Sequence, residues 1–173
     1  MATMILLPDD TGIVDSGWVA VGEATHHECL DDDNAATSYS KCSTDGDKVV
    51  IEYANPSVPD ADIASIDSVR FLSSGKAIHR TNPSIVFISF QAPTAGFSET
   101  VSYDNHASSY ETINGTARTT SDGSAAWTYS DLEALQMMCT KSLTVEVYLS
   151  YLALEVTYTE AVTDNAVFFG TNF

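Results

Sequence analysis

Basic residues are scarce in this chain. Its 173 residues hold 7 Lys and Arg against 24 Asp and Glu, a formal net charge of −17. A surface this acidic repels the phosphates of nucleic acids and the anionic surface of membranes. We therefore expect a protein that binds neither nucleic acid nor a membrane.

Long apolar runs are also missing from the sequence. A membrane-spanning helix needs about 20 consecutive apolar residues, whereas the longest candidate stretch, 143–158, is interrupted by Glu146, Ser150 and Glu155. The first eight residues lack the basic start and the full apolar stretch of a secretory signal. Synthesis in a cytoplasm is therefore expected.

Cysteine is rare and unevenly spaced. Cys29, Cys42 and Cys139 are odd in number, so they define no disulfide framework and are predicted to be buried free thiols. Hydrophobic residues make up 44% of the chain, enough for one core without disulfides, metals or cofactors. The length fits a single main domain.

Alternation of apolar and polar residues dominates what is present, and Thr, Ser, Val, Ile and Tyr are abundant in the alternating segments. The pattern predicts an all-β fold, an antiparallel, jelly-roll-like β-sandwich. Nine strands are predicted, at 18–22, 26–30, 37–41, 48–53, 66–72, 85–91, 98–104, 112–119 and 143–158. The last changes phase near Ser150, which predicts either a bulge or a switch between the two sheets at that point of a central strand.

One helix is predicted near residues 131–138. Ser130-Asp131-Leu132-Glu133 has the Ser-x-x-Glu spacing of a capping box, and apolar residues follow it. The stripe formed by Leu132, Leu135 and Met138 favours a structural lid over an open end of the sandwich.

The two ends differ from the middle in composition, so the chain is divided into an N-terminal arm (1–16), a β-sandwich domain (17–159) and a C-terminal aromatic tail (160–173). Apolar residues on polar segments suggest arms that dock on a partner. The residues concerned are Met4, Ile5, Leu6 and Leu7 at one end and Val167, Phe168, Phe169 and Phe173 at the other. The alternative, that both ends fold back onto their own domain, is equally weighted.

No catalytic motif is present, and the chain is not expected to be an enzyme. His26, His27, Glu28 and Cys29 with Cys42 offer zinc-type ligands, but strand alternation would divide them between two faces. Asp31, Asp33, Asp45 and Asp47 are candidates for a calcium site, without the Glu that closes an EF-hand loop. Packing and solvated turns are the favoured interpretations of both groups.

Aromatic residues near loops could stack on sugar rings. Tyr103 and Tyr110 are the candidates to face a glycan. Trp127 and Tyr129 lie in the same region, and Trp127, immediately before the predicted helix, is expected to pack beneath it. Core packing is favoured over ligand contact for this group as a whole.

Several short motifs occur in an order that resembles β-sandwich virion structural proteins of tailed bacteriophages. These are Gly17-Trp18, Leu30-Asp31-Asp32 with Tyr39, Ile66 and Val69, Trp127-Thr128, Asp131-Leu132-Glu133-Ala134-Leu135, and the segment from Val145 to Tyr158. The resemblance implies a jelly-roll-like or lectin-like component of a phage particle and brings no catalytic residues.

Two functions follow as hypotheses. The first is a capsid decoration or cement protein in the virion, a homo-oligomer that binds the major capsid protein or other virion proteins through its arms. The alternative is a host-recognition or carbohydrate-binding module of a tail or fibre, with Tyr103 and Tyr110 at the ligand.

Overall fold

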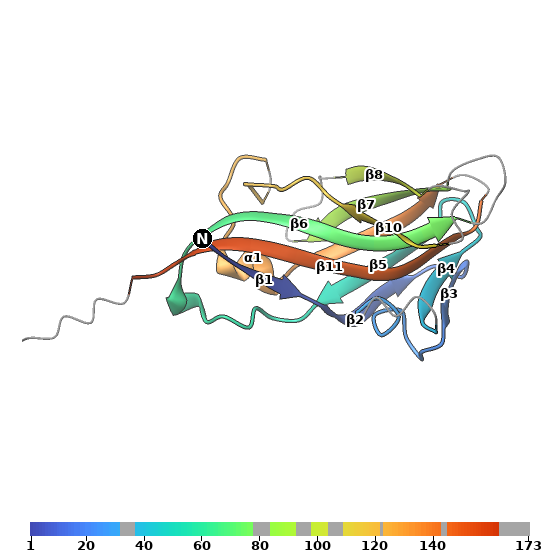
Figure 1. Ribbon diagram of the computed structural model, residues 1–173, viewed down its shortest axis with the longest axis horizontal. Helices are drawn as coiled ribbons and strands as arrows, with labels where there is room; N and C mark the ends of the chain where they lie inside the picture. Colours follow the sequence, from blue (N-terminus) through green and yellow to red (C-terminus); the bar gives the residue numbers. More distant parts are fainter. Residues whose placement is uncertain are drawn as a thin grey trace, which may run out of the picture.

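The structure, a computed structural model, describes residues 1–31, 37–77, 84–92, 98–103, 109–121, 123–142 and 145–162. It consists of two antiparallel sheets that pack face to face (Figure 1). No helix within these ranges has the length and apolar character needed to cross a bilayer.

Sheet A contains six strands and sheet B five. Sheet A runs in the order β3 (Trp18–Val21), β4 (Tyr39–Cys42), β11 (Val147–Glu160), β6 (Ile63–Ala77) and β9 (Glu111–Asn114), and β1 (Ala2–Leu6) also pairs with β11. Sheet B runs in the order β2 (Pro8–Val14), β5 (Lys48–Tyr53), β10 (Gln136–Ser142), β7 (Ser84–Ala92) and β8 (Ser98–Tyr103). The chain crosses repeatedly between the sheets, which confirms the predicted jelly-roll-like sandwich.

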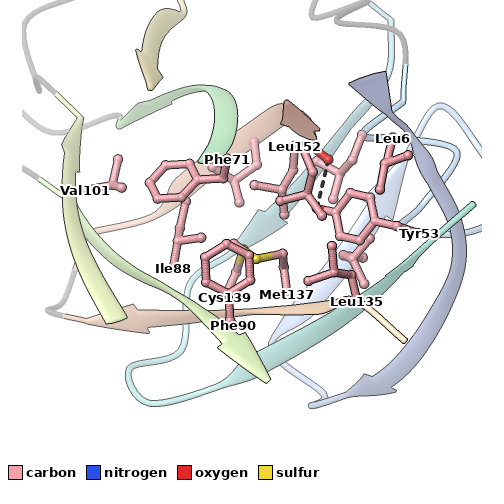
Figure 2. Close-up of a cluster of buried hydrophobic side chains, with 14 of the residues drawn as sticks. Leu6, Tyr53, Phe71, Ile88, Phe90, Val101, Leu135, Met137, Cys139 and Leu152 are labelled. Atoms are coloured by element: carbon pink, nitrogen blue, oxygen red, sulfur yellow. Dashed lines mark hydrogen bonds between the residues drawn. The ribbon is translucent and has the colours of Figure 1, made fainter. Parts of the chain in front are cut away.

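The core lies between the sheets and is built from the inward parity of each strand (Figure 2). Among its buried polar groups, the Tyr53 hydroxyl donates to the carbonyl of Leu152 at 3.1 Å, which satisfies a donor that would otherwise be costly to bury. All three cysteines are buried and free, as predicted. Burial raises the pKa of the Cys139 thiol to about 12, so this thiol is unreactive at neutral pH.

Strand β11 bends where the sequence changes phase. Its register with β6 shifts between Leu149 and Tyr151, so Leu149 before the shift and Leu152 after it both face the core. The predicted bulge is confirmed. The central position is confirmed as well, because β6 pairs along one side of β11 while β4 and β1 share the other.

The predicted strand at 26–30 is wrong, because residues 22–31 form bends and turns. Local hydrogen bonds close these turns: Glu28 accepts from the backbone and hydroxyl of Thr25, and the Leu30 amide donates to the His27 carbonyl. Side-chain acceptors of this kind compete with a sheet ladder for the same donors.

The prediction of one short helix is confirmed, but the helix is shorter than residues 131–138 and lies earlier in the chain. Helix α1 spans Tyr129–Glu133, with Thr128 as the N-cap and Asp131, instead of Glu133, completing the capping box. Residues 136–142 are strand β10, in which Met137 and Cys139 are buried and Met138 lies on the opposite face. Alternation therefore overrides the helical spacing of Leu132, Leu135 and Met138.

The predicted N-terminal arm is wrong. Met4 and Leu6 pair with Val156 and Leu154 of β11 and are 6% and 2% exposed. Figure 2 shows Leu6 in the same cluster as Tyr53 and Leu152. Of the predicted docking residues here, only Ile5 and Leu7 are exposed. Residues 8–14 form β2, so the sandwich includes most of the predicted arm.

The predicted C-terminal docking residues Val167, Phe168, Phe169 and Phe173 lie outside the described residues.

Candidate ligand-binding groove

A groove of about 590 Å³ lies on the outer face of sheet B, over strands β2, β5 and β10. Volumes of roughly 300 to 1,000 Å³ are usual for sites that hold small molecules. The groove is lined by Gly12, Ile13, Asp15, Lys48, Val50, Glu52, Gln136 and Met138.

Strand register brings these residues together. Gln136 pairs with Glu52, Met138 with Val50 and Thr140 with Lys48 across β10 and β5. Because side chains alternate along a strand, all six lie on the face opposite Met137 and Cys139, which point into the core. The result is a polar row beside an apolar row.

The polar row holds one donor and acceptor pair. The Gln136 side-chain amide donates to Glu52 Oε1 at 2.9 Å. This bond fixes both side chains and leaves the Gln136 carbonyl oxygen and the second Glu52 oxygen as further acceptors, with one amide proton as a donor. Gly12 lies against this pair and has no side chain. A Cβ at Gly12 would lie 3.3 Å from Glu52 Oε1, so a larger residue there would crowd the carboxylate.

The apolar row forms the floor and extends along the sheet. Val50 is 6% exposed, and a Cβ at Gly12 would lie 3.5 Å from its Cγ1, while the next residue of the edge strand β2, Ile13, is 69% exposed. Farther along the same face, Phe87 pairs with Thr140 and is 38% exposed. A ligand that leaves the groove over β10 would therefore meet an aromatic ring.

Asp15 closes the other end of the groove. Its carboxylate accepts from the Lys48 amide at 2.9 Å, and its own amide donates to the Lys48 carbonyl at 2.9 Å. These bonds hold the end of β2 against β5 and keep the Lys48 side chain, which is exposed, at the rim.

A second cavity, of about 470 Å³, lies where the segment before β6 meets the end of β11. Its titratable lining is Asp62, Glu160 and Tyr158. The two carboxylates of this cavity can only accept hydrogen bonds from a hydroxylated ligand, whereas the Glu52–Gln136 pair offers both acceptors and an amide donor. The groove on sheet B is therefore the stronger candidate.

The structure separates the two predicted glycan-facing tyrosines. Tyr103 is fully buried and its hydroxyl donates to Ser73 Oγ at 2.9 Å, so its prediction as a glycan contact is wrong. Gly75 explains the burial, because a Cβ there would lie 2.6 Å from the Tyr103 ring. Tyr110 is half-buried at the surface, on the side of sheet A and away from the groove.

Trp127 is a core residue, 5% exposed, and Tyr129 is the first residue of α1. The Trp127 ring lies 5.7 Å from that of Phe90 and its indole donates to the Arg118 carbonyl, while the Tyr129 hydroxyl donates to the Val58 carbonyl.

The zinc-type residues do not converge. His26 bonds Ser40 Oγ at 2.7 Å and His27 bonds Thr11 Oγ1 at 3.1 Å, while Cys29 contacts the Val21 carbonyl. Burial lowers the pKa of His26, which keeps its imidazole neutral. Glu28 is bonded to Thr25, and Cys42 donates to the Thr44 carbonyl.

The acidic candidates for calcium serve as local contacts where they can be seen. Asp47 accepts from the Gly17 amide at 2.7 Å, Asp31 and Asp45 have other interactions, and Asp33 lies outside the described residues. Within the described residues, no group of three or more His, Cys, Asp or Glu side chains is placed to hold a metal ion.

Comparisons with known proteins bear on the fold alone. No family model matches the chain, and no curated protein matches it. Among solved structures it is similar to a family 6 carbohydrate-binding module, with a TM-score of 0.44 and 13% identity over 91% of this chain and 94% of that one.

Two further similarities are of the same kind. A family 11 carbohydrate-binding module from Clostridium thermocellum, solved in complex with a β-1,3-1,4-mixed-linked tetrasaccharide, has a TM-score of 0.44 and 14% identity over 88% of this chain and 86% of that one. A family 29 module from Piromyces equi has a TM-score of 0.41 and 10% identity over 90% and 91% of the two chains. At these TM-scores the similarities carry no argument about a ligand of this chain.

Proposed function

We propose that this chain is a carbohydrate-binding module, without catalytic activity, whose ligand lies in the groove of sheet B. The observation that carries the proposal is the pairing of an apolar floor, Val50 and Met138, with a fixed donor and acceptor pair, Glu52 and Gln136, along one side. A sugar ring has the complementary form, with apolar C–H faces and hydroxyl groups at its edge.

The charges of the groove favour a neutral glycan. Asp15 and Glu52 oppose the single cation Lys48 in the lining, and the whole chain carries a formal charge of −17. A polyanion would be repelled on approach and again at Glu52, whose carboxylate is better suited to accept from sugar hydroxyls.

The test begins with affinity electrophoresis of the protein in gels containing neutral β-glucan, xylan or mannan. The best ligand is then measured by calorimetry against Gln136→Ala. Loss of a side-chain hydrogen bond costs about 1.4 kcal/mol, so a roughly tenfold weaker affinity is expected. Glu52→Gln keeps the shape of the side chain and should weaken binding by a similar factor.

Thr100→Ala is the matched control, because Thr100 is exposed on the same face but lies on β8, beyond Phe87. It should bind as the wild type does. If no neutral polysaccharide retards the protein, or if Gln136→Ala and Thr100→Ala bind equally well, the groove is not the site.

A second candidate function is a component of a phage particle, and the order of motifs between Gly17 and Tyr158 supports it. Many of those residues are in the core, including Trp18, Trp127 and Leu132, so they suit a shared fold without specifying a place on the particle. The decoration hypothesis also loses its N-terminal arm, since Met4 and Leu6 are core residues. Quantitative mass spectrometry of purified particles tests it: hundreds of copies per particle indicate a shell protein, and few or none argue against one.

A further inference from the structure

A cluster of tyrosine and lysine side chains lies on the outer face of sheet A, on the opposite layer of the sandwich from the groove. It consists of Tyr39, Lys41, Lys76, Tyr110 and Tyr148, and we refer to it as the tyrosine–lysine cluster. Register places Lys41, Tyr148 and Lys76 in one row across β4, β11 and β6. Two ammonium groups therefore flank one aromatic ring.

The Tyr148 ring is held in place by its neighbours. Its hydroxyl donates to Glu146, and its centroid lies 5.3 Å from that of Tyr39 with the planes inclined at 53°. Burial raises the pKa of Tyr148 and its hydrogen bond with Glu146 raises it further, so the phenol stays protonated and remains a donor. A ring fixed in this way needs little ordering when a ligand stacks on it.

The two lysines differ in how their charge is balanced. Lys41 Nζ lies 4.0 Å from Glu146 Oε2. Lys76 Nζ lies over two rings, 4.5 Å from the centroid of Tyr110 and 5.5 Å from that of Tyr148. Lys41, Arg70 and Arg118 each form a salt bridge with a carboxylate, whereas none is found for Lys76 within the described residues.

An uncompensated lysine is unexpected in this chain, where acidic residues outnumber basic ones by 24 to 7. The aromatic faces attract the ammonium group but leave its charge formally unneutralised. An anionic group is the complement of that charge, and a stacking ring beside it is the complement of a sugar face.

We propose that the tyrosine–lysine cluster is a second binding site, which takes a carboxylate-bearing sugar unit: the sugar ring stacks on Tyr148 and its carboxylate meets Lys76. This site is independent of the proposed groove, whose charges favour a neutral ligand. The two sites would let one module contact two kinds of glycan from opposite faces.

The net charge of the protein opposes a long polyanion but not a short one. At physiological salt, interactions between exposed charges are screened beyond about 8 Å. A carboxylate in contact with Lys76 is within that range, and the acidic side chain in contact with the cluster, Glu146, is already bonded to Tyr148 and lies 4.0 Å from Lys41. Short oligosaccharides at physiological salt are therefore the right probes.

The experiment compares a trimer of galacturonic acid with its fully methyl-esterified form, which has the same rings and no charge. By calorimetry in about 0.15 M salt, the acid trimer should bind the wild type at least tenfold more tightly than the ester. Lys76→Gln should remove that difference. Tyr148→Ala should weaken both ligands, and Tyr148→Phe, which keeps the ring, should retain most of the binding if the Ala variant does not fold.

Arg70→Gln is the matched control, because Arg70 lies on the same strand and face but is paired with Glu155 at 2.8 Å. It should preserve the preference for the acid. Gln136→Ala should also preserve it, which separates this site from the groove.

Any of three results with the two trimers would overturn the proposal: no binding of the acid trimer, equal binding of acid and ester, or a preference that survives Lys76→Gln. Triglutamate binding as tightly as the acid trimer would also overturn it, because the site would then recognise a carboxylate without a sugar.

Discussion

Leu6→Ala is the sharpest test of the N-terminal segment. Leu6 is 2% exposed and pairs with Leu154 of β11. Met4 is the only other large apolar side chain that β1 places in the core. If the segment is a strand of the sandwich, the substitution leaves a cavity between the sheets. If the segment were an arm that docks on another molecule, the substitution would leave the unfolding free energy of the isolated protein unchanged.

The expected magnitude follows from burial. Removing a buried leucine side chain costs about 2 to 5 kcal/mol, which combines the lost transfer energy with the cavity left behind. Small domains have an unfolding free energy of about 5 to 15 kcal/mol, so the loss is a large share of the total. Ile5→Ala is the control, since Ile5 is adjacent but 44% exposed, and about 0.5 kcal/mol is expected for it.

Urea unfolding followed by tryptophan fluorescence measures both variants, because Trp18 and Trp127 are 4% and 5% exposed in the folded protein and report its loss. The midpoint for Leu6→Ala should fall far below that for Ile5→Ala with an unchanged slope. Equal and small shifts for the two variants would refute the placement of β1 in the core.

Two further predictions concern stability. Gly75→Ala should destabilise the fold by about 1 to 3 kcal/mol in the same assay, because the new Cβ would lie 2.6 Å from the Tyr103 ring, which is fully buried; wild-type stability would contradict this. Burial lowers the pKa of His26 below its ordinary value of 6.5. As the pH falls, this side chain therefore takes up its proton at a higher pH in the unfolded chain than in the folded protein. The unfolding free energy should decrease as the pH drops through 6.5 towards the folded-state pKa. His26→Gln should reduce the fall between about pH 7.5 and about pH 5.5; an identical pH profile for the two proteins would exclude this role.

The fold class could be predicted because alternation is a local property of the chain. Strand β5 coincides with its predicted range, and the bend in β11 follows from the change of phase at Ser150. Strand β1 could not be identified in the same way. Met4, Ile5, Leu6 and Leu7 are all apolar, so alternation is invisible there, and the partner strand lies about 150 residues away in sequence.

Competition between two local patterns explains the error around residue 136. Leu132, Leu135 and Met138 satisfy helical spacing, while Met137 and Cys139 satisfy alternation. Pairing of β10 with both β5 and β7 decides in favour of the strand, and that pairing is set by tertiary structure. The burial of Tyr103 is also set by tertiary structure, because its ring packs against Gly75 of the other sheet, where a Cβ would lie 2.6 Å from the ring.

The groove had no signal in the sequence because its residues come from three separated strands. Glu52 and Gln136 are 84 residues apart, and only the register of β5 and β10 makes them neighbours. The sequence offered aromatic residues near loops as candidates for a sugar site. Of these, Tyr103 is buried in the core and Tyr110 lies on the side of sheet A, away from the groove.

The most direct test of the central claim is an amide-resolved NMR titration of the ¹⁵N-labelled protein with the neutral glycan that binds best. The proposal predicts that the largest shifts map to β5 and β10 around Val50, Glu52, Gln136 and Met138, with few changes on sheet A. Saturable shifts confined to sheet A or to the strand ends would contradict a glycan site in the groove.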